Sequence, residues 1–196
     1  ADSIIGDINV KLNVNGKLDE LIRDGEISIK NGSVYTILMD EPLNQISASA
    51  TLYNNIMKIN SFNSSLYDSD FNRNIKDNLN LQGDIDFKQF FEPKYNLKVL
   101  GENVFFRSLN GDIEAYTDLD LAISGKDTLN IFGTVKAKDG AIYKEFNNNS
   151  TIDLAEEKGR TTTNYNIRFP IEDSFSIRNS QIDAKISGEL AMSRQF

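Results

Sequence analysis

The sequence contains no cysteine and no histidine. The absence of cysteine excludes a disulfide framework and any thiolate metal site, and it leaves the cellular compartment open. The absence of histidine removes the commonest general base and the commonest ligand of transition metals, so a Ser-His-Asp relay cannot form although serine is abundant. The chain also lacks a phosphate-binding G-x-x-x-x-G-K-[ST] loop. We therefore expect no enzymatic activity and no cofactor.

Long apolar runs and an excess of basic residues are missing as well. No apolar run approaches the roughly 20 residues that a membrane-spanning helix needs, and no signal peptide is visible. The formal net charge is −8, which argues against a nucleic-acid surface and, more weakly, against docking on an anionic membrane face. Because the chain opens and stops within a repeating pattern, we interpret it as a section of a longer protein whose targeting sequence or anchor lies elsewhere.

The sequence instead shows long alternation of apolar and polar residues, most clearly between Ile113 and Ile123. Consecutive side chains of a β-strand point to opposite faces, so this period of two predicts a strand with one apolar face. Similar stretches follow one another along the chain, and none has the length and the 3.6-residue period of a helix. We predict an all-β protein, in which the polar stretch 63–78 forms a loop or a rim.

The alternating pattern recurs with glycines at matching positions. Residues 6–35 align with residues 111–143: the glycines and the closing tyrosine of the second strand match at an offset of 108 residues, and Gly6 matches Gly111 at an offset of 105. Residues 181–190 match the first strand again at an offset of 172. Internal repetition indicates stacked units that share a continuous core.

These repeats predict a single section of a β-repeat groove over residues 1–196, with copies at about 6–110 and 111–178 and the start of a third at 179–196. Each strand is apolar on one face, which suits either a closed sandwich of two sheets or one sheet curled around its apolar face. We favour the second arrangement, because repeats in a fixed order can continue past both ends. The expected fold is an elongated, curved, antiparallel-rich sheet that forms an open groove with a hydrophobic interior.

An open groove with no protein filling must hold something apolar, because contiguous exposed apolar surface marks a binding site. The inward positions of the alternating strands should line this groove. These candidate lining residues are Val10, Leu12, Val14, Ile27, Ile29, Leu79, Leu81, Ile85, Leu97, Val99, Ile113, Leu119, Leu121, Ile123, Val135, Ile167, Phe169, Ile182 and Ile186.

The repeating unit has a recognisable form in residues 6–35 and 111–143. It begins with Gly-Asp-Ile, continues as an alternating strand to a glycine, and ends in a second strand closed by (Asp/Asn)-Gly-x-(Val/Ile)-Tyr. This unit resembles the repeats of the TamB/AsmA-like proteins of the bacterial envelope, and the segment LQGDIDF at 81–87 is similar to strands of the same family. The resemblance covers nearly all of the chain, and the repetition carries it more than any single motif does.

The resemblance implies a taco-shaped β-groove in the periplasm of a double-membraned bacterium, anchored to the inner membrane outside this chain. It implies that the groove holds phospholipid acyl chains and conducts phospholipids between the inner and outer membranes, or supports the assembly of outer-membrane proteins. An outer-membrane β-barrel would then be a partner through parts outside this chain. The family supplies no catalytic residue, and we expect no nucleic-acid partner.

Two other functions fit the same residues. Free edges of the sheet can bind client β-strands by augmentation, which would make the protein a scaffold or chaperone. A closed sandwich or β-solenoid can act as an adhesin that binds polysaccharide through surface tyrosine and aspartate.

Pairs of acidic residues and of phenylalanines stand out from the alternation. Asp84 with Asp86, and Asp118 with Asp120, place two carboxylates on one strand face, as a Ca²⁺ site would require. We interpret both pairs as the solvated face of a strand.

The adjacent pairs Phe90-Phe91 and Phe105-Phe106 point one ring to each face. We expect either that both rings fold under an edge of the sheet, or that one contacts lipid or a partner.

Overall fold

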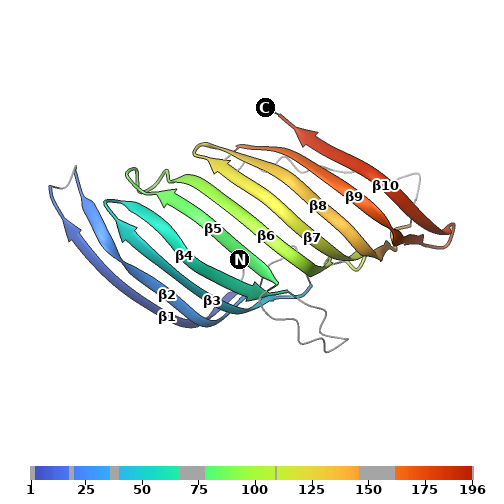
Figure 1. Cartoon of the computed structure of the whole chain (residues 1–196), viewed down its shortest axis with the longest axis horizontal. Coiled ribbons are helices and arrows are strands. Elements are labelled where there is room, and N and C mark those ends of the chain that lie inside the picture. Colours follow the sequence, from blue (N-terminus) through green and yellow to red (C-terminus); the bar gives the residue numbers. More distant parts are fainter. Residues whose placement is uncertain are drawn as a thin grey trace.

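The computed structural model describes residues 3–17, 20–35, 40–66, 78–108, 110–145 and 162–195. Within these ranges the chain forms ten β-strands and no helix (Figure 1), which confirms the predicted all-β class. The strands are β1 (Ser3–Asn15), β2 (Ile22–Tyr35), β3 (Leu43–Tyr53), β4 (Ile56–Ser65), β5 (Leu79–Asp86), β6 (Lys94–Arg107), β7 (Ile113–Gly125), β8 (Thr128–Ile142), β9 (Thr162–Arg178) and β10 (Asp183–Arg194).

All ten strands belong to one sheet, in which each strand lies beside its neighbours in the sequence from β1 to β10. Every neighbouring pair is antiparallel except β8 and β9, which run parallel. A tight turn can join antiparallel strands, whereas a parallel pair needs a longer crossover. Residues 143–161 make this crossover, and 146–161 lie outside the described residues. The antiparallel-rich sheet was predicted, but its parallel step was not.

The sheet is a single layer. Extensive contacts between strands of the described residues occur only between sheet neighbours, so no second sheet packs on either face. Figure 1 shows the sheet open, with β1 and β10 at opposite ends. The closed sandwich and the β-solenoid are therefore not the observed fold, whereas the open sheet agrees with the predicted groove.

Irregularities in strand pairing fall on one line across the sheet. An extra residue in one strand of a pair bends that strand and increases its twist. The irregularities include those at Ile5/Asp7 in β1, Ile29/Gly32 in β2, Ile59/Asn63 in β4, Gly101/Val104 in β6, Ala137/Asp139 in β8 and Ile186/Gly188 in β10. We call this line the crease, and Figure 1 shows strands β1 to β3 turning round at the lower edge of the view.

Left-handed backbone conformations mark the same line. Asn31 in β2, Gln45 in β3 and Asn103 in β6 have φ angles of 53°, 53° and 51°. Asparagine tolerates this region better than most residues, but glutamine does not, so the bend at Gln45 is imposed by the sheet around it. The crease divides each strand into a short arm and a long arm. In β1, for example, the short arm precedes the irregularity at Ile5/Asp7 and the long arm follows it.

The few buried apolar side chains gather near the crease and on the short arm. They are Ile46, Leu66, Val104, Phe105, Ala115, Ala141 and Phe175, with Leu52 as the exception on the long arm. The long arm therefore has almost no conventional core.

The prediction that the polar stretch 63–78 forms a loop or a rim is partly wrong. Residues 63–65 continue β4, and Ser64 and Ser65 are fully buried. Residues 67–77 of that stretch lie outside the described residues.

Strand pairing supports the first two sequence repeats. Val10 lies opposite Ile27 as Leu119 lies opposite Val135, which gives offsets of 109 residues for the first strand and 108 for the second. The pairing irregularities of the two hairpins lie next to each other in this alignment, just before Asp7 in β1 and just after its counterpart Tyr116 in β7. The alignment of Gly6 with Gly111 is wrong, because an offset of 109 makes Ala115 the counterpart of Gly6.

The third alignment, of residues 181–190 with the first strand, stays a prediction. Pairing runs in one row from Thr117 through Ala137 and Ile171 to Gly188, which places Gly188 on the inner face. A row does not identify repeat counterparts, because Val10 shares a row with Ile123 although its counterpart at the offset of 109 is Leu119.

Gly133 and Gly188 provide a matched test of how closely β7 and β8 approach. Their φ angles are 143° and 144°, so alanine is strained at both positions by about 1–3 kcal/mol. A Cβ at position 133 would also lie 2.0 Å from the carbonyl oxygen of Asp120, whereas a Cβ at 188 meets nothing within 4 Å. Gly133→Ala should therefore lower the urea midpoint of unfolding more than Gly188→Ala does. Equal midpoints would contradict this close approach.

Candidate functional site

Pairing between strands determines which side chains share a face of the sheet, because residues directly opposite each other point the same way. Leu121 of β7 lies opposite Val99 of β6 and Gly133 of β8, and similar rows extend to both ends of the sheet. We call the apolar set on this face of the long arm the apolar stripe. It consists of Val10, Leu12, Val14, Ile27, Ile29, Ala48, Ala50, Leu52, Met57, Ile59, Leu79, Leu81, Ile85, Leu97, Val99, Leu119, Leu121, Ile123, Ile131, Val135, Ile167, Phe169, Leu190 and Met192.

Most of the predicted lining residues belong to the apolar stripe. Ile113 and Ile186 lie on the same face but on the short arm, where they pair with Ile142 and Phe175. Ile182 immediately precedes β10 and is not part of the strand. The pairing therefore joins the predicted residues into one surface, although it divides them at the crease.

The prediction missed the stripe residues of β3 and β4. In β3 the inward positions Ala48 and Ala50 are small, so their alternation with serine gives a weak signal. In β4 the irregularity after Ile59 changes the phase, so apolar residues occur in both registers along the sequence. β10 adds Leu190 and Met192, whose alternation with polar neighbours was visible in the sequence.

The apolar stripe is accessible along its whole length. Among its members only Leu52 is buried, whereas the stripe residues of β6 and β7 are half-buried. At the β1 edge the exposed fraction reaches 50–56% for Val10, Leu12 and Val14. No strand of the described chain packs over this surface. Contiguous apolar surface of this extent is the feature that marks a binding site.

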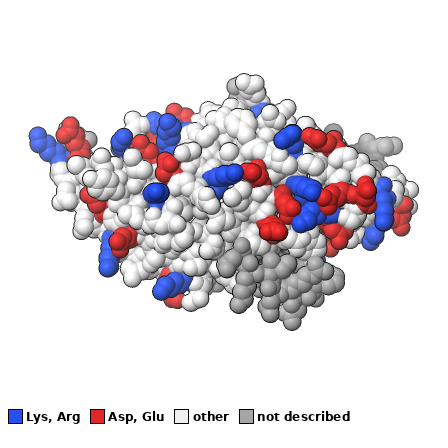
Figure 2. All heavy atoms as spheres, viewed as in Figure 1, with Lys and Arg blue, Asp and Glu red and all other residues white. Residues whose placement is uncertain are grey.

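The opposite face of the sheet carries the charges. Lys98 and Asp120 lie 3.3 Å apart there, and Lys136 pairs with Glu172. The hydrogen bond to Glu172 raises the pKa of Lys136. Figure 2 shows basic and acidic side chains next to each other on the face in view, with no large area of one sign. Balanced, exposed pairs of this kind keep a surface solvated and contribute little to stability.

The first acidic pair is occupied by protein donors. Asp118 Oδ1 accepts hydrogen bonds from the backbone N–H of Asn103 at 2.8 Å and from Lys138 Nζ at 3.2 Å. Asp120 pairs with Lys98 at 3.3 Å. Asp118 therefore satisfies a backbone donor within the crease, a structural role that its position in the sequence did not reveal.

The second acidic pair is engaged in the same way. Asp84 accepts a hydrogen bond from Asn96 at 3.1 Å, and Asp86 accepts one from the backbone N–H of Lys88 at 2.9 Å. Across the described ranges, no group of three or more acidic, histidine or cysteine residues is arranged to hold a metal ion.

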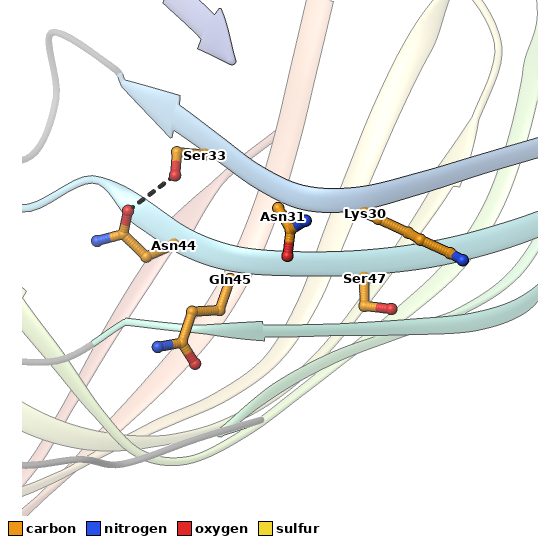
Figure 3. Close-up of a pocket in the computed structure, with 6 residues that line it drawn as sticks. All are labelled: Lys30, Asn31, Ser33, Asn44, Gln45 and Ser47. Carbon is orange, nitrogen blue, oxygen red and sulfur yellow. Dashed lines mark hydrogen bonds between the residues drawn. The ribbon is translucent and has the colours of Figure 1, made fainter. Parts of the chain in front are cut away.

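A polar depression of about 690 Å³ lies at the crease between β2 and β3 (Figure 3). Ser33 Oγ donates a hydrogen bond to Asn44 Oδ1 at 3.0 Å within it. The depression is lined by Lys30, Asn31, Ser33, Asn44, Gln45 and Ser47. This hydrogen bond joins the two strands at their bend, and all six lining side chains are polar or charged.

The two phenylalanine pairs have different surroundings. Phe105 is fully buried on the polar face, with the Arg107 guanidinium 5.0 Å from its ring centre and the Tyr116 ring at 5.1 Å. In the β5–β6 turn, Phe90 is 52% exposed and Phe91 is 94% exposed. The expectation that both rings of a pair fold under an edge is therefore wrong for Phe91.

No helix long and apolar enough to cross a membrane occurs in the part of the chain that the structure describes. No protein-family model matches the chain, and no curated protein or solved structure was found to be significantly similar to it. The site must therefore be interpreted from its own geometry.

The role of Asp118 can be separated from that of Asp120 by substitution. Asp118→Ala should lower the free energy of unfolding by about 1–2 kcal/mol, because the N–H of Asn103 loses its acceptor. Asp120→Ala should cost less than about 0.5 kcal/mol, because its pair with Lys98 is exposed. Calcium should leave the melting temperature of the parent protein unchanged. A calcium-dependent rise that either substitution abolished would show that the pair is a metal site.

Proposed function

We propose that this chain is a section of a periplasmic hydrophobic groove that conducts phospholipids between the inner and outer membranes. The observation that carries the proposal is the apolar stripe, which crosses the sheet from β1 to β10 without a covering layer in the described residues. The proposal requires the crease to turn the two arms of the sheet toward this face, so that the stripe lies in a trough and the charged face lies outside.

The chemistry of the stripe suits acyl chains. Burial of each CH₂ group contributes about 0.8 kcal/mol, which is enough to retain a chain of many methylenes without any specific contact. Because neighbouring sites along the stripe are alike, a lipid can diffuse between them without a catalytic step. The mechanism is passive, and the groove supplies a path rather than a reaction.

The end of the stripe offers a place for a headgroup. Arg23 lies opposite Val14 on the stripe face, at the end of the long arm. Asn55 Oδ1 accepts a hydrogen bond from Arg23 Nη1 at 3.1 Å, and the guanidinium lies 5.1 Å from the ring centre of Phe90. A guanidinium held in this way at an apolar rim suits a lipid phosphate, because its planar donors match phosphate oxygens.

The resemblance to the TamB/AsmA-like repeats supports the cellular setting of this proposal. In that setting the groove stands in the periplasm, is anchored to the inner membrane by parts outside this chain, and works beside an outer-membrane β-barrel. Support of outer-membrane protein assembly belongs to the same proposal. The outer edge of β1, which no strand of the described residues pairs with, favours a second candidate, a scaffold that binds client strands by augmentation.

Photocrosslinking can compare the two faces at adjacent positions. A photoreactive residue at 121 points into the stripe, whereas one at 122 lies on the exposed opposite face of the same strand. With phospholipid vesicles present, position 121 should capture lipid and position 122 should not. Equal capture at both positions, or none at either, would contradict the proposal.

Charge substitutions give a matched functional test. Leu121→Asp places a carboxylate in a half-buried, open position, so it should cost less than about 3 kcal/mol and leave the protein folded. Ala122→Asp adds the same charge on the other face. We expect Leu121→Asp to lose lipid capture from a photoreactive residue at 123, and Ala122→Asp to retain it. If Leu121→Asp unfolds the protein while Ala122→Asp does not, position 121 belongs to a closed core.

A further inference from the structure

β1 forms one end of the sheet, and among the described residues no strand pairs with its outer edge. The stripe residues Val10 to Val14 are 50–56% exposed there. Their counterparts Leu119 to Ile123 in β7 are half-buried, because β6 lies beside them. The same pattern of residues is thus found once in the interior of the sheet and once at its edge.

The two strands are equivalent on the side where both are paired. Leu12 lies opposite Gly25 as Leu121 lies opposite Gly133. The backbones approach equally closely, since a Cβ on Gly25 would lie 2.1 Å from the carbonyl oxygen of Lys11, and one on Gly133 would lie 2.0 Å from that of Asp120. The outer edge of β1 therefore corresponds to the edge of β7 that pairs with β6.

The pairing of β6 with β7 predicts the residue pattern of a strand that could pair with β1. Val99 lies opposite Leu121, Gly101 lies opposite Leu119, and Val104 lies opposite Thr117 after an extra residue. At the offset of 109, Leu121, Leu119 and Thr117 correspond to Leu12, Val10 and Ile8. The partner strand therefore needs an apolar residue opposite Leu12 and a small residue opposite Val10. After one extra residue, it needs an apolar residue opposite Ile8.

We propose that the outer edge of β1 binds an antiparallel strand with this β6-like pattern, supplied by another repeat unit of the same kind. Its bulge continues the crease, and its inward side chains extend the apolar stripe. β1 also lacks two of the features that protect an edge, since none of its residues is proline and none of its inward residues is charged. The proposal does not depend on lipid binding.

Pairing of two β1 strands about a two-fold axis does not satisfy the same geometry. The crease passes β1 at Ile5/Asp7, near the beginning of the strand that runs from Ser3 to Asn15. Antiparallel pairing of two such strands would place the short arm of one beside the long arm of the other. The creases would not meet, and the apolar faces would lose their common surface.

Disulfide trapping can test the register, because the chain contains no cysteine of its own. The probe is a synthetic peptide with the sequence of residues 94–107, added to the full chain. Leu12→Cys in the protein should form a disulfide with a peptide that carries Val99→Cys, because these positions would lie directly opposite each other. A peptide with Leu100→Cys points its thiol to the other face, so it should react at least about tenfold more slowly.

The extra residue gives a second, independent comparison. Ile8→Cys should be trapped by a peptide with Val104→Cys, and removal of Glu102 from that peptide should abolish this disulfide, because the side chains beyond the deletion change face. The peptide lacking Glu102 should still react through position 99 with Leu12→Cys. Circular dichroism of both protein variants confirms that they remain folded.

Three outcomes would overturn the proposal. They are no trapping above the Leu100→Cys control, trapping at Ile8→Cys that is unaffected by removal of Glu102, and equal trapping by Leu190→Cys on the β10 edge. Each would show that the β1 edge has no preference for a β6-like strand. None of these results bears on lipid capture at position 121, so failure here leaves the proposed function to be judged by its own test.

Discussion

The structure depends on one constraint: neighbouring strands must stay in register on both sides of the crease. Each extra residue shifts the phase of one strand, and a shift of one residue turns every later side chain to the other face. The sheet keeps its apolar stripe because these shifts fall on a common line. The hydrogen bond from the Asn103 N–H to Asp118 belongs to this line, and the close packing at Gly133 lies farther along the long arm.

The crease also explains why a protein with so small a core folds as a single layer. Buried apolar residues concentrate near the bend and on the short arm, where Phe105 is fully enclosed. The long arm leaves its apolar face open and relies on continuous pairing between neighbouring strands instead. An open apolar face beside a charged outer face is the arrangement that the proposed lipid groove requires, and it extends to β1, where the sheet can accept a further strand.

Much of the site could be predicted because alternation fixes the face of each residue. Ile186 and Leu190, for example, lie on the same face of β10, as their alternation with polar residues predicted. The bend at Gln45 could not be predicted, because nothing in the sequence there signals a left-handed conformation. The bulge after Ile59 in β4, in contrast, is signalled by apolar residues in both registers of that strand. The parallel step between β8 and β9 and the burial of Phe105 on the polar face depend on contacts distant in sequence. Neither leaves a local signal.

The central claim is that the apolar stripe holds lipid. The most direct measurement is mass spectrometry of organic extracts from the purified protein, compared with extracts of the same protein carrying Leu121→Asp. The account predicts that phospholipid accompanies the parent protein in an amount comparable to the protein itself and is strongly reduced in the folded variant. Absence of phospholipid from both extracts, or equal amounts in the two, would contradict it.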